Sequence, residues 1–123
     1  DSTLDRILAR ADLRHGGFGE APKFPQFPLL SFLWDAAVYT GRADVSGVVV
    51  KALDSLCQGG IYDHIGGGLA RYSVDAAWHV PHFEKMLGDN AQFIHLLSDV
   101  FRETQNPLYA ARARETISFW QRE

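Results

Sequence analysis

Ionisable and aromatic side chains gather between positions 61 and 90 of this sequence, in a segment that glycine interrupts repeatedly. Its ionisable side chains include Asp63, His64, Arg71, Asp75, His82 and Glu84. Carboxylic acids and imidazoles give and take protons near neutral pH when their surroundings shift their pKa values. Enzymes that cleave or epimerise sugars need such groups beside one sugar carbon or oxygen. We therefore interpret this segment as a candidate site for a carbohydrate.

The proton-transferring groups are expected among the acids and histidines of this segment. We predict that Glu84 or His82 transfers the proton, with Asp63 or Asp75 as the partner carboxylate. Apolar neighbours would raise the pKa of one carboxylate by desolvation. Glu84 and Asp89 also suit the start of a helix, where an acid meets the positive end of the helix dipole, so a structural role stays open for both.

Other side chains of the segment are expected to bind a substrate. Arg71 can hold an oxyanion with its forked guanidinium group. Tyr72 and Trp78 carry rings that stack on the apolar face of a sugar, although such rings also fill protein cores. His64 would line the same pocket. Together these residues predict a substrate site next to the proton-transferring groups.

Metal and nucleotide chemistry have weak support. The segment from His79 to His82 has a spacing that resembles a pair of metal ligands, but Pro81 prevents the helix that would put both rings on one face. Gly66-Gly67-Gly68 is not followed by Gly-Lys-Ser/Thr and has no strand–turn–helix context, which excludes a phosphate loop and a dinucleotide fingerprint. The three glycines predict either a backbone cradle for a ligand or a tight turn under a neighbouring helix. We predict neither a metal nor a cofactor.

Helices must hold this segment in place, and the spacing of apolar residues predicts five of them. They are expected over about residues 3–15, 28–40, 43–58, 86–101 and 107–120. The first carries Leu4, Ile7, Leu8 and Ala11 on one face, and the second is apolar on nearly every side, which predicts burial all round. Short breaks join the second helix to the third and the fourth to the fifth, so each pair should form an antiparallel hairpin.

The loop before the second helix contains three phenylalanines, Phe18, Phe24 and Phe27, which we expect to anchor it to the core. Repeated helical hairpins with long loops at one end predict an all-α ring of helices. Two hairpins cannot close a ring. The chain also begins without Met and ends in sequence of helical character, so we expect a piece of a longer protein.

Composition limits the class of protein and the kinds of partner. The chain has 123 residues, 46% of them hydrophobic, and a net charge of −3, which suits one globular domain. No basic stripe and no run of eighteen apolar residues is present, so we expect no nucleic-acid partner and no membrane span. The single cysteine, Cys57, excludes an internal disulfide and favours a buried position in a cytoplasmic protein. Apolar helix faces left uncovered would let the chain self-associate.

Four motifs, in order, resemble a known family. They are Gly16–Pro25, Gly59–Gly68, Arg71–Asp75 and Pro81–Leu87. Residues 12–123 are similar to the thioredoxin-domain-containing, spermatogenesis-associated-protein (YyaL-like) family. The resemblance implies a thioredoxin-like domain followed by an (α/α)6 toroid of the six-hairpin glycosidase type, similar to N-acylglucosamine 2-epimerases. Residues 1–123 would be the first hairpins of that toroid, without the thioredoxin-like domain.

The resemblance also implies a function, in two alternative forms. One is a carbohydrate-acting domain of the epimerase or glycosidase type; the other is a non-catalytic binding or scaffold module that accompanies a thioredoxin-like domain. It adds Asn90 to the substrate-binding candidates, because the family motif reads Met-Leu-Tyr-Asp-Asn-Ala there. Gly88 stands where that motif has tyrosine, a difference expected either to widen the pocket or to remove a hydrogen bond.

Overall fold

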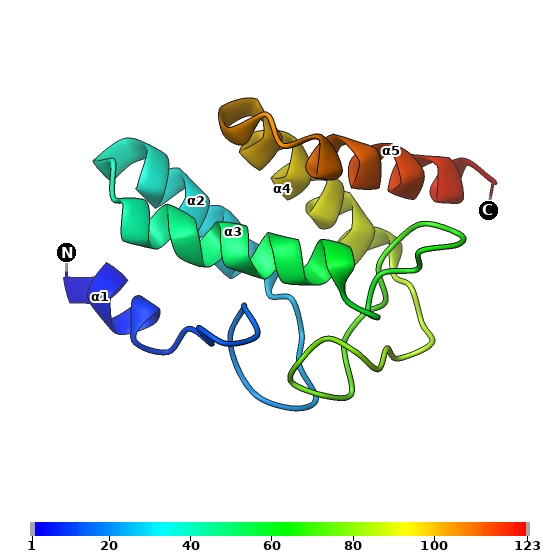
Figure 1. Ribbon diagram of the computed structural model, residues 1–123, viewed down its shortest axis with the longest axis horizontal. Helices are drawn as coiled ribbons and strands as arrows, with labels where there is room; N and C mark the ends of the chain where they lie inside the picture. The colour runs from blue at the N-terminus through cyan, green and yellow to red at the C-terminus, as the bar shows by residue number, and fades with distance from the viewer. Residues whose placement is uncertain (1, 123) are drawn as a thin grey trace.

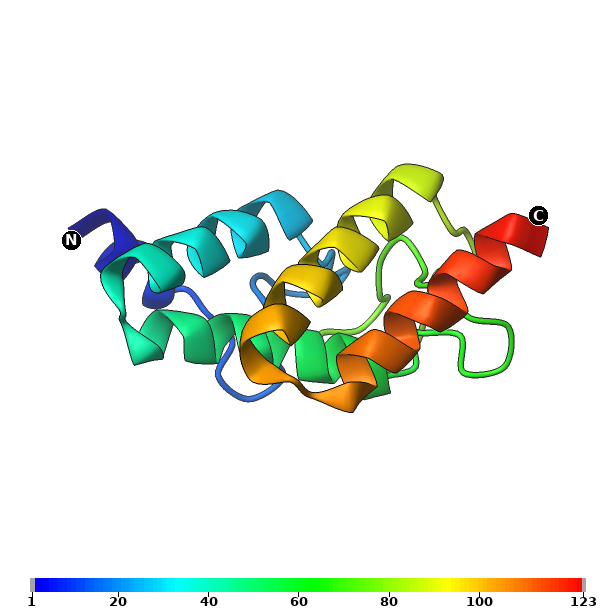
Figure 2. The ribbon, with the colours of Figure 1, turned by 90° about the horizontal axis from the view of Figure 1, so that it is seen from above.

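The computed structural model describes residues 2–122, and five helices form its framework. They are α1 (Ser2–Leu8), α2 (Phe27–Thr40), α3 (Ala43–Gln58), α4 (Leu87–Thr104) and α5 (Pro107–Arg122). The pairs α2–α3 and α4–α5 are antiparallel hairpins, as predicted, and α2 packs on α4 between them (Figure 1). Seen from above, the α4–α5 hairpin crosses the α2–α3 hairpin obliquely (Figure 2). Within residues 2–122 the only β-structure is a set of isolated bridges, so the prediction of an all-α fold is confirmed.

Proline, glycine and asparagine set the ends of these helices. Pro28 lies in the first turn of α2, where its missing N–H is not needed. Gly41 ends α2 with a left-handed φ of 74° and donates its N–H to the carbonyl of Ala37. The side chain of Asn106 accepts the N–H of Leu108 at 3.0 Å and so caps the start of α5.

The core lies between the two hairpins and consists of aliphatic and aromatic side chains from α2, α3 and α4. Fully buried examples are Leu30, Leu33, Val49, Leu53, Phe93 and Leu97. Burying each such side chain stabilises the fold by about 1.5–3 kcal/mol. The core therefore holds the helices firmly enough to support long loops at their ends.

The first helix is shorter than predicted. It ends at Leu8, and Ala11 lies beyond it in an antiparallel bridge with Phe18. The cause is a tight turn in which the N–H of Asp12 donates to the carbonyl of Gly17, while Gly16 donates to the carbonyl of Asp12, both at 2.8 Å. The first of these bonds takes the N–H of Asp12, which a longer helix would bond to the carbonyl of Leu8.

The second helix is not buried all round, contrary to the prediction. Phe32 is 50% exposed, Val38 58% and Tyr39 91%. Only α3 and α4 make extensive contact with α2, so the side of α2 that carries these three residues faces outward. An apolar helix face is thus left open in the described chain.

Both long loops, residues 9–26 and 59–86, lie at the same end of the helices (Figure 1). They are joined by an antiparallel bridge, in which Lys23 and Ser73 exchange backbone hydrogen bonds of 2.7 and 2.8 Å. The Lys23 side chain is buried and donates to Asp12 at 2.7 Å and to the Ala76 carbonyl at 3.0 Å. Phe18 is buried as expected, whereas Phe24 is 41% exposed. The two loops therefore form one packed layer.

Candidate functional site

The second long loop folds back on itself as two extended arms. The N–H of Arg71 donates to the carbonyl of Glu84 at 2.8 Å, and the N–H of His82 donates to the carbonyl of Tyr72 at 3.0 Å. These bonds fix four of the predicted site residues as neighbours. Arg71 and Tyr72 come from one arm, His82 and Glu84 from the other.

An arginine and two carboxyl groups interact near the end of these arms. The Arg71 guanidinium is 3.7 Å from the Glu84 carboxylate, and both side chains are about half exposed. Asp89, in the first turn of α4, interacts electrostatically with both. Burial raises the pKa of Asp89, Glu84 adds to the effect, and Arg71 opposes it. Two carboxyl groups in different environments can take the acid and base roles of a proton transfer.

His82 is held between aromatic and backbone contacts. Its ring stacks on Tyr72 with centroids 4.5 Å apart and an interplanar angle of 17°. Tyr72 in turn contacts Phe24 of the first loop, with centroids 4.8 Å apart. The N–H of Glu84 donates to Nδ1 of His82 at 3.3 Å, so a neutral ring carries its proton on Nε2. These contacts fix the ring plane and leave Nε2 for a ligand.

An open hollow of about 430 Å³ lies between residues 60–65 and 81–85. Its polar lining includes three predicted site residues, Asp63, His64 and His82, together with Lys85. The apolar lining comes from both sides of the hollow and consists of Ile61, Tyr62, Ile65, Ala70, Pro81 and Phe83. A mostly apolar hollow with a few polar groups is typical of sites for small ligands.

Asp63 acts as a fixed negative charge in this hollow. Its carboxylate accepts the N–H groups of Ile65 and Gly66 at 3.0 and 2.8 Å, and Lys85 donates to it at 2.8 Å. The bond from Gly66, followed by that from Lys85, lowers the pKa of Asp63 to about 2. His64 is exposed, and its Nε2 lies 2.9 Å from the Gly59 carbonyl. A carboxylate that stays ionised is a poor proton shuttle at neutral pH, contrary to the predicted role of Asp63 as partner acid.

Asp75 lies apart from the hollow, and the prediction that it transfers protons is wrong. Its carboxylate accepts the N–H groups of Ala77, His79 and Val80 and the hydroxyl of Ser73. Burial acts to raise the pKa of Asp75, but these hydrogen bonds outweigh it and bring the pKa well below its usual range. The side chain therefore holds a turn together.

Trp78 and Asn90 are structural as well, contrary to the prediction that they bind substrate. Trp78 is 1% exposed, and its indole N–H donates to the carbonyls of His15 and Gly16 at 3.1 and 3.2 Å. Asn90 is fully buried and bonds the N–H and the carbonyl of Leu69 at 2.8 and 3.0 Å. Neither side chain is accessible to a sugar.

The glycine run is a tight turn under a helix. Gly67 has a φ of 86°, and a Cβ on it would come within 2.5 Å of the Glu115 carbonyl in α5. The carbonyl of Gly67 accepts the Lys85 ammonium at 2.8 Å. Of the two interpretations of the run, the geometry favours the structural one.

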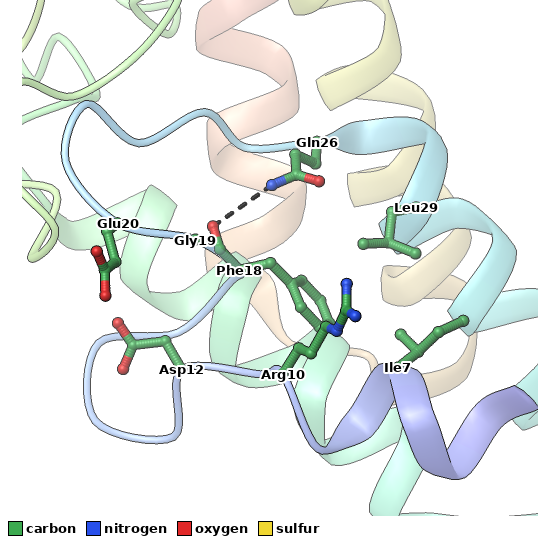
Figure 3. A pocket seen from close by; sticks show the side chains of 8 residues that line it. All are labelled: Ile7, Arg10, Asp12, Phe18, Gly19, Glu20, Gln26 and Leu29. Atoms are coloured by element: carbon green, nitrogen blue, oxygen red, sulfur yellow. Dashed lines mark hydrogen bonds between the residues drawn. The ribbon is translucent and has the colours of Figure 1, made fainter. Parts of the chain in front are cut away.

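A larger hollow, of about 680 Å³, lies between α1, the first loop and the start of α2 (Figure 3). Its lining includes Ile7, Arg10, Asp12, Phe18, Glu20 and Leu29. Figure 3 shows Asp12 and Glu20 on neighbouring parts of the loop, and Gln26 donating to the carbonyl of Phe18 at 3.4 Å. None of the predicted site residues lines it, so the smaller hollow remains the candidate site.

Two residues of the site were not among the predicted site residues. Asp89 is predicted as one of the acids of the segment, with a structural role at a helix start left open, and Phe24 only as an anchor of the first loop. The signal for Asp89 is its position five residues after Glu84, across the start of a helix. No sequence signal places Phe24 on Tyr72, because the two lie on different loops.

Among residues 2–122 no group of three or more His, Cys, Asp or Glu side chains is arranged to hold a metal ion. The helices of this same range include none that combines the length and apolar character needed to cross a bilayer.

Curated relatives share most of this sequence. An uncharacterised protein of Caenorhabditis elegans is 45% identical over 98 residues, which are 76% of this chain and 13% of that protein. Spermatogenesis-associated protein 20 of Homo sapiens is 40% identical over 113 residues, 88% of this chain and 14% of that protein. The chain thus spans about one seventh of the length of these relatives. No protein-family profile matches the chain.

Solved structures share its fold at low identity. A sugar epimerase from a ruminal bacterium superposes with a TM-score of 0.79 at 16% identity, over 94% of this chain and 33% of that structure. The cellobiose 2-epimerase of Spirochaeta thermophila DSM 6192 superposes with a TM-score of 0.78 at 17% identity, over 98% of this chain and 36% of its own. The helical hairpins therefore have the arrangement found in about a third of an (α/α)6 toroid, which confirms the predicted architecture.

Proposed function

Because the chain is homologous to a segment of spermatogenesis-associated protein 20 and has the fold of sugar epimerases, we propose that it is the part of a carbohydrate-acting, epimerase-like domain that holds one side of the sugar site. The observation that carries the proposal is the cluster of Arg71, Glu84 and Asp89 next to His82. It supplies a cation, two carboxyl groups and an imidazole, and the imidazole also lines the open hollow. Fold alone does not fix an activity, so this cluster is the main support.

Each residue of the cluster has a definite task in the proposed reaction. Epimerisation next to a carbonyl removes a proton from carbon and returns one to the opposite face. His82 is suited to donate a proton through Nε2, because its Nδ1 accepts the N–H of Glu84, and the Glu84 carboxylate is suited to accept the proton that leaves carbon. Arg71 would bind the oxygen on which negative charge develops. Glu84 keeps Arg71 in place, and Asp89, whose pKa burial raises, can act as an acid.

Proton exchange with solvent tests this proposal directly. The protein is incubated in D₂O with a panel of neutral saccharides that includes cellobiose, and deuterium at the carbon beside the carbonyl is followed by NMR. We expect incorporation with the unaltered protein and a loss of at least a hundredfold in His82→Asn, since a general acid–base group contributes about 10²–10⁴-fold. Glu84→Gln should reduce the rate, because it removes the proton acceptor. Glu103→Gln, an exposed change on the far end of α4, is the matched control.

Two results would contradict the proposal. One is that no saccharide binds to or exchanges with the unaltered protein. The other is that His82→Asn and Glu103→Gln exchange deuterium equally fast, because the imidazole would then have no part in the reaction.

A second candidate function is a binding module without turnover. The observation that favours it is that Asp63 and Asp75 serve the backbone, which leaves few free proton-transferring groups. The same experiment separates the two: saccharide binding detected by NMR, with no deuterium incorporation, supports the module.

We also propose that the longer protein carries a thioredoxin-like domain and is cytoplasmic. The open face of α2 is proposed to let the chain self-associate, which light scattering at several concentrations would measure.

A further inference from the structure

Two large apolar side chains stand bare at the rim of the 430 Å³ hollow. Phe83 is 99% exposed and Ile65 is 100% exposed, and both line the hollow. Exposed apolar side chains that converge on one concave site commonly mark a place where a ligand or a partner binds. The exposure of these two side chains at the hollow therefore points to something that binds there.

The backbone on both sides of Phe83 is fixed, although its ring is free. The carbonyl of Glu84 accepts the N–H of Arg71 at 2.8 Å, and the N–H of His82 donates to Tyr72 at 3.0 Å. Phe83 lies between these two bonded residues, so its ring is presented from a rigid support. Because this backbone is already fixed, no loop has to be ordered when a ligand covers the ring.

Ile65 is presented in the same way on the opposite side. It sits at the tip of the turn that the Asp63 carboxylate closes by accepting the N–H groups of Ile65 and Gly66. Lys85 in turn fixes Asp63, with a bond of 2.8 Å. The two apolar side chains thus come from separate, rigid parts of the loop and share one hollow.

The polar lining identifies the kind of occupant. Asp63, His64, His82 and Lys85 line the hollow with acceptors and donors, and its apolar lining includes the exposed Phe83 and Ile65. A pyranose ring has this dual character, with C–H groups on its faces and hydroxyl groups on its edge. A purely apolar ligand would take water away from the Asp63–Lys85 ion pair and from the two imidazoles without replacing its hydrogen bonds, which is costly.

We propose, on the basis of the function proposed above, that Phe83 is the stacking platform for a neutral sugar ring and that Ile65 covers the ring from the other side. Phe83 thus takes the role that the sequence predicts for Trp78, because the Trp78 side chain is buried in the core. The specificity is for neutral saccharides, because Asp63 and Lys85 pair at 2.8 Å and leave no net charge in the hollow to attract an anionic substituent.

The test measures binding, so it does not depend on turnover. Saccharide affinity is determined by ligand-detected NMR for the unaltered protein, Phe83→Ala, Phe83→Trp and Phe32→Ala, with neutral disaccharides, cellobiose among them, and their uronic-acid analogues as probes. Phe32, which is 50% exposed on α2, provides a matched truncation away from the hollow. We expect Phe83→Ala to weaken binding of neutral sugars about tenfold. Phe83→Trp should keep the affinity and show a blue shift of tryptophan fluorescence when sugar is added.

The outcomes separate the two proposals. Unchanged affinity in Phe83→Ala, or an equal loss in Phe32→Ala, overturns the stacking role while sugar binding itself stands. Tighter binding of the uronic acids would overturn the specificity. If the unaltered protein binds no saccharide, the proposed function fails. Because Phe83 is bare, its truncation should leave the thermal midpoint unchanged, and a lowered midpoint would assign it to the fold instead.

Discussion

Asn90 offers the sharpest test of how the second loop is attached to the helices. It is fully buried in the first turn of α4, and its amide makes three hydrogen bonds to the loop. Oδ1 accepts the N–H of Leu69 at 2.8 Å, and Nδ2 donates to the carbonyls of Leu69 and Met86 at 3.0 and 2.9 Å. We predict that Asn90→Ala destabilises the protein by breaking this attachment.

The expected loss of unfolding free energy follows from the backbone groups of Leu69 that Asn90→Ala leaves without partners. Leu69 is fully buried, so its N–H and its carbonyl would both lose their partners away from water. Each such group costs about 1–3 kcal/mol. The better helix propensity of alanine returns at most about 0.7 kcal/mol. We therefore expect the free energy of unfolding to fall by about 2–5 kcal/mol, a large share of the roughly 5–15 kcal/mol typical of a domain.

Urea denaturation followed by circular dichroism measures this change. Gln92→Ala, an exposed substitution two residues further along α4, is the control and should change the unfolding free energy by less than about 0.5 kcal/mol. A loss below about 1 kcal/mol in Asn90→Ala would refute the reasoning. So would a loss of saccharide affinity with full stability, because that result would return Asn90 to the substrate site.

Asn90→Asp extends the test to pH. The aspartate can still accept the N–H of Leu69, but when ionised it faces two carbonyl oxygens and lies away from water. Burial then raises its pKa in the folded state above the unfolded value of about 3.9. The variant should be destabilised at pH 7 and should recover, relative to the unaltered protein, as the pH falls and the protonated acid donates again.

Three further predictions concern the same loop. Trp78→Phe should lower the free energy of unfolding by about 1–3 kcal/mol, because two buried carbonyls lose their donor, and saccharide affinity measured by NMR should stay the same. Gly67→Ala should lower the thermal midpoint, since it combines a φ of 86° with a Cβ only 2.5 Å from the Glu115 carbonyl; an unchanged midpoint would mean that the turn does not pass under α5. The pKa of Asp63, about 2 in the folded protein and about 3.9 when unfolded, predicts that stability falls as the pH drops from about 4 to about 2, and Asp63→Asn should flatten that part of the curve.

Periodicity in the sequence was sufficient to predict the framework of the fold. Helices α2 to α5 begin and end close to their predicted positions, because proline, glycine and asparagine act on the backbone within a few residues. The first helix was predicted too long, since its end depends on a turn in which Asp12 bonds Gly16 and Gly17. Local spacing also overestimated the burial of α2, because the burial of a helix depends on which other helices pack against it.

The site was harder to predict than the framework, for a physical reason. Residue types indicated one segment as the candidate site, and four of its candidates, Arg71, Tyr72, His82 and Glu84, are adjacent in the structure. Their pairing arises from two arms that fold back without any periodic pattern. The burial of Trp78 depends on carbonyls of the other loop, more than sixty residues away, as the separations of 62 and 63 positions show. Contacts over such distances leave no trace in local spacing.

The bridge between Lys23 and Ser73 has an evolutionary consequence. Lys23 also donates to the carbonyl of Ala76, 53 positions further on, so a residue gained or lost in either loop would pull that lysine away from its partners. Natural variants should therefore change the two loop lengths together or not at all. Laboratory libraries that randomise one loop alone will mostly yield misfolded clones, whereas libraries that transplant both loops as a pair should give many more folded ones.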